Sequence, residues 1–228
     1  MQRSPRIPLW LRLALVPLVA AIVIAGIWLA GGVLTNDFRL SMLLTALWVG
    51  LVGLAALIVA VRWRPLALPV LGTVVVTAGS VMGYLFYASS VDTVVDEQVA
   101  VPAPEPATGE ASGQVRRARP DQNVALGRGR FESAAHGTSG KATLIRLAEG
   151  GRVLTLTDFE TDPGPDLRVY LVTGDVDDLG DVVDLGALKG NRGDQQYEVE
   201  RSVDAERYRT VVIWCRAFSV AFGSAGLA

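Results

Sequence analysis

The chain has 228 residues, half of them hydrophobic, with 21 lysine and arginine residues against 23 aspartate and glutamate residues. The net charge of −2 and the absence of a long basic run exclude the electrostatic footprint of a nucleic-acid-binding protein. The single cysteine, Cys215, excludes a disulfide within the chain. Nearly every long apolar run precedes residue 90, so the composition predicts a membrane part followed by a water-soluble part.

Residues 1–88 contain three apolar runs, 13–34, 40–61 and 66–88, without one charged side chain. At ~1.5 Å per residue, each run is long enough to cross the ~30 Å hydrocarbon layer as a helix. We therefore expect a membrane anchor of three transmembrane helices, with the lipid bilayer as its partner. Lacking Asp, Glu, Lys and His, these runs offer no proton relay and no paired haem ligands. Gly79 and Gly83 form a small-xxx-small pair, which allows two helices to approach closely.

The arginines beside these runs predict the orientation, because arginines near a span favour the cytoplasmic side. Five fall on one side of the three spans: Arg3, Arg6, Arg12, Arg62 and Arg64. Arg39, accompanied by Asp37, falls on the other side. The pattern predicts a multi-pass protein of the cell membrane with a cytoplasmic N-terminus and an extracytoplasmic C-terminal domain.

A cleavable signal peptide is the rival interpretation of the first apolar run, which follows arginines and contains small residues near Ala30. Its length exceeds that of a typical signal-peptide core. Cleavage would leave two spans, and the predicted side of the C-terminal domain would be unchanged.

Residues 89–122 are polar and contain Pro102, Pro104, Pro106 and Pro120. Prolines alternating with small residues are typical of an extended, semi-rigid spacer. We expect a linker here that separates the anchor from the C-terminal domain.

From residue 123 to 228 the pattern changes to short period-two runs separated by Gly, Asp and Asn, which is typical of antiparallel strands. The expected strands are 125–133, 140–147, 152–158, 167–173, 182–188, 194–201, 209–215 and 218–222. Glu149-Gly150-Gly151 predicts a hairpin turn, because glycine adopts positive φ freely. The predicted fold class is multi-part: three transmembrane α-helices followed by an all-β, sandwich-like domain.

Several motifs stand in a fixed order along this domain. They are Gly129-Arg130-Phe131, His136-Gly137-Thr138-Ser139-Gly140-Lys141-Ala142, Gly164-Pro165-Asp166-Leu167-Arg168-Val169-Tyr170-Leu171 and Ile213-Trp214-Cys215-Arg216-Ala217-Phe218. With this combination the domain resembles the DM13 family over residues 123–228. The resemblance implies a β-sandwich module often found with DOMON-type cytochrome domains in electron-transfer proteins. It also implies that the family's motif cysteine, matched here by Cys215, reacts directly or ligates a prosthetic group such as haem.

Cys215 follows the apolar run Val211–Trp214, and two interpretations of it remain open. A redox role requires a thiolate, which nearby positive charge favours, although strand alternation directs Arg216 to the opposite face. Alternatively, the thiol is buried as a small, inert hydrophobic side chain.

His136, the one histidine, lies in a turn rich in glycine and serine. Because the C-terminal domain contains no methionine, His136 and Cys215 are the candidate ligands if the domain holds haem. The absence of a C-x-x-C-H motif excludes covalently attached c-type haem, and the cofactor stays open. The alternative for His136 is a turn residue that forms hydrogen bonds within its own loop.

Asp175, Asp177, Asp178, Asp181 and Asp184 form an acidic segment. Calcium takes six to eight oxygen ligands from such segments, but Leu179 and Gly186 occupy the fifth and twelfth positions, where an EF-type loop needs ligands. We expect a solvated acidic loop and predict no metal site.

Two functional hypotheses follow. In the first, the chain is a membrane-anchored extracytoplasmic redox or electron-transfer module that uses Cys215 and a redox protein partner. In the second, it is a non-enzymatic surface binding or adhesion module with a structural, buried cysteine. Hydrolase motifs such as G-x-S-x-G and H-E-x-x-H are absent, which disfavours a hydrolase. The electron donor, the acceptor and the oligomeric state stay open.

Overall fold

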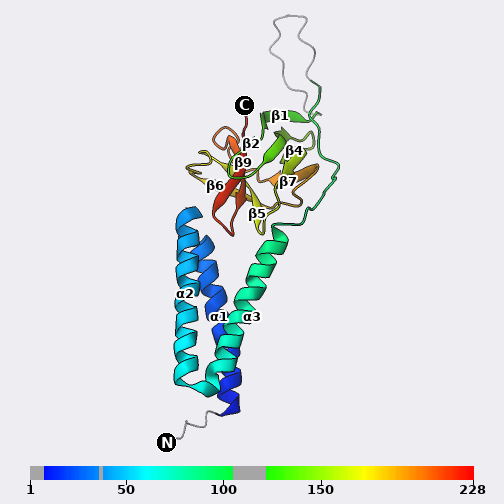
Figure 1. The fold of residues 1–228 in the computed structure, drawn as a ribbon. Coiled ribbons are helices and arrows are strands. Elements are labelled where there is room, and N and C mark those ends of the chain that lie inside the picture. The colour runs from blue at the N-terminus through cyan, green and yellow to red at the C-terminus, as the bar shows by residue number, and fades with distance from the viewer. Residues whose placement is uncertain (1–7, 36–37, 105–121) are drawn as a thin grey trace, which may run out of the picture. The chain divides into compact units, whose positions relative to one another are not determined.

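The fold was analysed in a computed structural model, which describes residues 8–35, 38–104 and 122–228 (Figure 1). The chain divides into two compact units: a helical unit that ends at Ser90 and also includes the short segment Arg216–Val220, and a β unit of Val91–Cys215 and Ala221–Ala228. Arg3, Arg6 and Asp37 of the orientation argument lie outside the described residues, as do Pro106 and Pro120 of the predicted linker.

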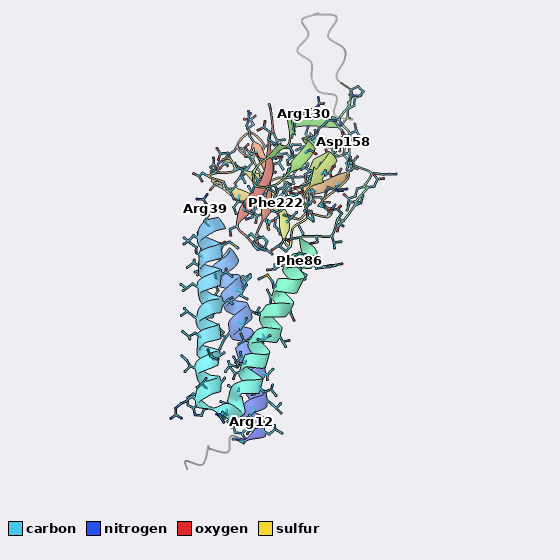
Figure 2. All side chains as sticks on the ribbon, in the orientation of Figure 1. Arg12, Arg39, Phe86, Arg130, Asp158 and Phe222 are labelled. Atoms are coloured by element: carbon cyan, nitrogen blue, oxygen red, sulfur yellow. The ribbon has the colours of Figure 1, made fainter. Side chains whose placement is uncertain are left out.

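The helical unit contains α1 (Leu9–Gly32), α2 (Phe38–Arg62) and α3 (Arg64–Ala88). All three are long and apolar enough to cross a membrane, which confirms the three predicted helices. Each helix contacts the other two, and their shared core is formed by Val23, Ala56, Val70 and Val74. Figure 2 shows Arg12 and Arg39 at opposite ends of this unit, as expected when consecutive helices run in opposite directions.

The close helix packing expected at Gly79 and Gly83 is not found among the described residues of the helical unit. A Cβ atom added at Gly79 or Gly83 would meet nothing within 4 Å, so this pair does not hold two helices of the chain together. The close approach lies instead at Gly26 of α1, where an added Cβ would fall 1.9 Å from the Trp48 indole of α2. The indole ring occupies the space that any larger residue at position 26 would fill.

The β unit consists of two antiparallel sheets, and a sandwich-like arrangement fits them, as predicted (Figure 1). The four-stranded sheet has the order β1 (Val124–Arg130), β3 (Thr138–Arg146), β4 (Arg152–Thr161) and β7 (Gln195–Val199). The five-stranded sheet has the order β2 (Glu132–Ser133), β9 (Val220–Gly226), β8 (Thr210–Cys215), β5 (Leu167–Val172) and β6 (Val182–Ala187). The predicted hairpin turn joins β3 to β4, with Gly150 and Gly151 both at positive φ.

The first predicted strand, 125–133, divides in two at Phe131. β1 pairs with β3 in one sheet, whereas β2 pairs with β9 in the other. Phe131 is buried and its ring meets the Phe159 ring edge-on at 5.1 Å. The chain thus changes sheets where it inserts this aromatic side chain, a corner typical of packed sheets.

A β-bulge interrupts the pairing of β3 with β4 at Gly140. Gly140 has a φ of 111°, and an added Cβ would lie 2.7 Å from the Cα of Phe159. Only glycine combines this backbone conformation with so close a backbone contact.

Candidate functional site

Cys215 is the last residue of β8 and is fully buried. It lies opposite Leu167 of β5, and every second pair from there along the two strands is Val169 with Ile213 and then Leu171 with Val211. Because side chains alternate along a strand, Cys215 shares one face of the sheet with Ile213 and Val211. This side chain therefore contacts the interior of the domain, and solvent does not reach its Sγ atom.

Trp214 occupies the opposite face of the same sheet. It packs with Tyr170, Val172, Val212 and Ala221, a cluster to which the four-stranded sheet contributes no residue. Cys215 therefore lies on the face that points toward the four-stranded sheet. The Tyr170 and Trp214 rings stack with their centroids 6.4 Å apart, so an aromatic pair directly adjoins the cysteine along the chain.

An ion pair accompanies this aromatic pair on the outward face. Arg168 lies opposite Trp214 in the pairing of β5 with β8, and its Nη2 atom is 2.6 Å from Asp184 Oδ2 of β6. The Arg168 Nε also donates to the Asp184 carboxylate. This face thus presents aromatic and paired charged groups side by side.

His136 lies in the turn after β2, and its ring stacks on Phe222 of β9 with the centroids 3.9 Å apart. Its Nδ1 is 3.2 Å from Oδ2 of Asp162, the residue that follows β4. The backbone N–H groups of Ala134 and His136 both donate to the Phe222 carbonyl, which fixes the turn against β9. The imidazole is about two-fifths exposed, so solvent reaches it.

Phe222 and Leu167 each adjoin one of the two candidate ligands and pack near each other. A Cβ atom added at Gly164 would be 2.9 Å from Leu167 Cδ2 and 3.0 Å from Phe222 Cζ, so both side chains press against the same backbone. The His136 ring stacks on one side of the Phe222 ring, and Leu167 is the cross-strand partner of Cys215. A haem iron bound by both His136 and Cys215 does not fit this arrangement unless these apolar side chains move. Haem ligation by this pair stays a prediction.

The carboxylates of the acidic segment are engaged locally. Asp175 Oδ1 accepts hydrogen bonds from the backbone N–H groups of Asp178 and Asp177, and these bonds lower the pKa of the Asp175 carboxyl. Asp181 forms an ion pair with Arg207. Turn formation engages the Asp175 carboxylate and arginine pairing engages that of Asp181.

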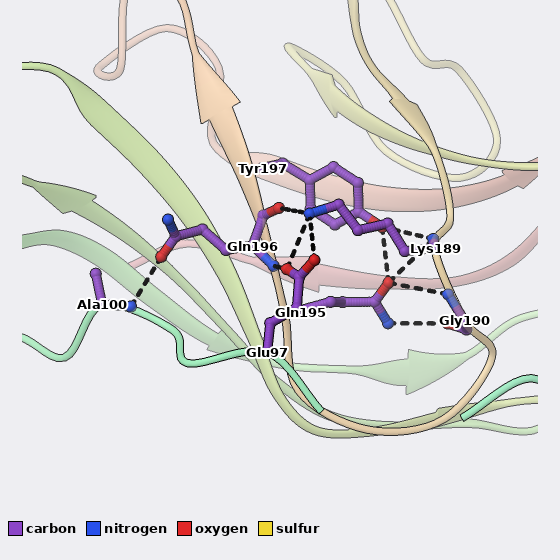
Figure 3. Close-up of polar contacts among 7 residues, drawn as sticks. All are labelled: Glu97, Ala100, Lys189, Gly190, Gln195, Gln196 and Tyr197. Carbon is purple, nitrogen blue, oxygen red and sulfur yellow. Dashed lines mark hydrogen bonds and ion pairs between the residues drawn. The ribbon is translucent and has the colours of Figure 1, made fainter. Parts of the chain in front are cut away.

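The segment between α3 and the β domain has contacts that its composition did not predict. Residues 91–103, hereafter the strap, run beside the loop before β7 and along β7 itself, and are hydrogen-bonded to both. Val95 N–H donates to the Arg192 carbonyl and Glu97 N–H to the Asp194 carbonyl. Figure 3 shows the Ala100 N–H donating to Gln196 Oε1 at 2.8 Å. This part of the predicted spacer is therefore attached to the β domain.

Glu97 is the charged anchor of the strap (Figure 3). Its carboxylate lies 2.8 Å from Lys189 Nζ and also accepts the Gln196 N–H at 2.9 Å. The hydrogen bond from Lys189 is the main cause of the lowered pKa of Glu97. Burial raises the pKa of the neighbouring Tyr197 to about 12, and its hydroxyl donates to Gln195 Oε1.

Residues 130–227 match the family model described as Electron transfer DM13. The match extends from the end of β1 through β9 and includes both His136 and Cys215. The resemblance to the DM13 family is thereby confirmed for the β domain: the chain carries a DM13 domain after three membrane-capable helices. Neither the search of curated proteins nor that of solved structures found a match.

Proposed function

We propose that the chain is a membrane-anchored electron-transfer module in which the DM13 domain exchanges electrons and Cys215 is the redox group. The observation that carries the proposal is the match of residues 130–227 to an electron-transfer family, in a chain with three membrane-capable helices. Cys215 lies within that match and is the single thiol of the chain.

The redox step that a single thiol supports is thiol–disulfide exchange with a protein partner. The Cys215 thiolate attacks one sulfur of the partner's disulfide, a mixed disulfide forms, and the other partner sulfur leaves as a thiolate that takes up a proton. A thiolate of a second, reduced dithiol protein then attacks the Cys215 sulfur and releases the first partner as a dithiol. The other thiolate of that second protein closes its own disulfide and releases the Cys215 thiolate, so that two electrons pass from the dithiol to the first partner's disulfide and Cys215 is regenerated. Because Sγ is buried, exchange requires local opening at the end of β8, where the strand gives way to a turn.

The complete burial of Cys215 favours a second candidate function, a surface binding module in which this cysteine is a core residue. In such a module the outward face with Arg168, Asp184 and the 175–181 loop would contact the partner. A sandwich fold supports either function.

Reaction with a disulfide distinguishes the two candidates. The full chain, purified in detergent, is mixed with an aromatic disulfide reagent, and the mixed disulfide is quantified by mass spectrometry. The electron-transfer proposal predicts complete, reductant-reversible modification of the folded chain at Cys215 and none in Cys215→Ser. Modification only after unfolding, together with a visible spectrum free of any chromophore, would leave the binding module.

We further propose that the DM13 domain lies on the extracytoplasmic side. Arg12, Arg62 and Arg64 belong to one end of the helical unit and Arg39 to the other, which supports this orientation. Alkaline phosphatase fused after Ala228 is expected to be active, whereas a cytoplasm-dependent reporter at the same position is expected to be inactive. The reverse pattern would overturn the orientation and leave the electron-transfer proposal intact.

A further inference from the structure

An apolar groove of about 490 Å³ is lined by all three helices at the end that carries the arginines. α1 contributes Leu15, Leu18, Val19 and Ile22; α2 contributes Val52, Ala55, Ala56 and Val59; α3 contributes Leu66, Val70 and Val74. Its lining is almost wholly hydrocarbon, as an acyl chain requires.

The positions that line the groove form helical stripes, because residues three or four apart share one face of a helix. On α1 the stripe extends one turn back from Leu15 to Arg12. On α2 it extends one turn forward from Val59 to Arg62. Trp63, which follows Arg62, itself lines the groove. The apolar stripes of α1 and α2 therefore end at arginines at the same end of the helical unit.

Arg12 has polar capacity that the chain does not use. Its Nε is buried and has no hydrogen-bond partner within the part of the chain that the structure describes. A guanidinium is the side chain best suited to bind a phosphate through several N–H groups. On α2, the Arg62 guanidinium lies 5.8 Å from the centroid of the Trp63 ring, a tryptophan position typical of the membrane interface.

We propose that this groove binds one anionic phospholipid of the surrounding leaflet, with an acyl chain along the groove and the phosphate at Arg12 and Arg62. Basic pockets between membrane helices bind anionic headgroups in this way. The occupant is a lipid, because the apolar groove and the arginines at its end match the two parts of a phospholipid. This inference rests on the proposed membrane anchoring and assigns a ligand to the helices, independently of the electron-transfer role.

The test uses the full chain reconstituted in nanodiscs of phosphatidylcholine with a minor fraction of phosphatidylglycerol. The chain is then released, and its retained lipids are counted by native mass spectrometry. The wild type is expected to retain phosphatidylglycerol well above its share of the bilayer. Arg12→Gln and Arg62→Gln are each expected to lower that enrichment by roughly fivefold, the electrostatic contribution of one arginine at a membrane surface. Inorganic phosphate is expected not to displace the lipid.

Two controls are matched to the site. Arg39→Gln removes an arginine at the other end of the helical unit and is expected to leave the enrichment unchanged. Ala55→Phe fills the groove at an exposed position and is expected to reduce lipid retention, whereas Leu57→Phe, exposed on α2 outside the groove, is not.

Retention of the two lipids in proportion to the bilayer by the wild-type chain overturns the inference, whatever the variants do. So does an enrichment that falls equally in Arg39→Gln and Arg12→Gln. A chain that fails to enter the nanodiscs at all contradicts the membrane anchor instead, so the two failures are distinguishable.

Discussion

Cys215 is at once the single thiol of the chain and a fully buried side chain. Neighbouring residues give it no open route to solvent, since Leu167 lies opposite it and Ile213 beside it on the same face. Its sequence context predicted both a redox and a core interpretation, and only the cross-strand pairing shows which side chains surround it. A redox role therefore depends on how often the end of β8 opens.

Replacement of Cys215 measures its contribution to the core. Cys215→Ala is expected to lower the free energy of unfolding by about 1 kcal/mol through lost packing. Cys215→Ser is expected to cost more, about 1–3 kcal/mol, because a hydroxyl loses more hydration than a thiol when it is buried. Urea denaturation of the full chain in detergent, followed by near-UV circular dichroism, checks the order. Equal stability of wild type, alanine and serine variants would show that the side chain is not packed in the core.

Gly140 is expected to tolerate no side chain. Gly140→Ala combines an unfavourable positive φ with a collision against the Phe159 backbone, and should destabilise the domain by about 3 kcal/mol or more. Gly151 is the matched control, with a similar φ of 95° but no atom within 4 Å of an added Cβ. Gly151→Ala should therefore cost only about 1 kcal/mol. Equal losses of unfolding free energy in Gly140→Ala and Gly151→Ala would show that the close contact with the Phe159 backbone does not contribute.

The helices and strands that could be predicted from the sequence are those whose hydrophobic pattern lies within the element itself. The three helices are continuous apolar runs. β4 contains a Leu-Thr-Leu-Thr alternation, which predicts a strand, although Thr155 on the polar side of that alternation is buried as well. The division at Phe131 was missed because the period-two pattern continues through the corner, while the partner strand changes from β3 to β9. Gly26 was missed because nothing in α1 itself indicates that Trp48 packs there.

The contacts of the strap also could not be predicted from the sequence. Several of its hydrogen-bond partners, such as Gln196 for Ala100, lie far along the chain, and its own residues have no period to indicate them. Likewise, the sequence identified His136 and Cys215 as chemically capable but could not show that His136 stacks on Phe222 while Cys215 pairs with Leu167. Such spatial relations depend on sheet register rather than on composition.

The ion pair that anchors the strap has a predictable pH dependence. Because Lys189 lowers the pKa of Glu97 in the folded chain, the pair stabilises the fold above the ordinary pKa of 4.5. That stabilisation is lost as the pH falls through the lower, folded-state pKa. Glu97→Gln should therefore cost up to about 1 kcal/mol near neutral pH, a value limited by the exposure of both side chains, and little in strong acid.

Urea midpoints of wild type and Glu97→Gln, compared at neutral and acidic pH, check this dependence. The Lys141–Asp158 pair, equally close but more exposed, supplies the control through Lys141→Gln, which should cost less. A gap between wild type and Glu97→Gln that widens in acid would contradict the assigned sign.

For the whole molecule, three membrane-capable helices and a DM13 domain occur in one chain. The family match of residues 130–227 suggests electron transfer for that domain, while the burial of Cys215 means that the thiol reacts only when the domain opens locally. A buried thiol is compatible with electron transfer if exchange occurs during local opening, because opening at a strand end requires far less free energy than global unfolding.

The most direct test is a coulometric titration of the full chain in lipid nanodiscs, wild type beside Cys215→Ser, with a small dithiol/disulfide couple as mediator. We predict reversible electron exchange in the wild type through formation and reduction of a mixed disulfide with the mediator, and its loss in Cys215→Ser. No reversible exchange by the folded wild-type chain, or equal exchange in both, would contradict the assignment of electron transfer to Cys215.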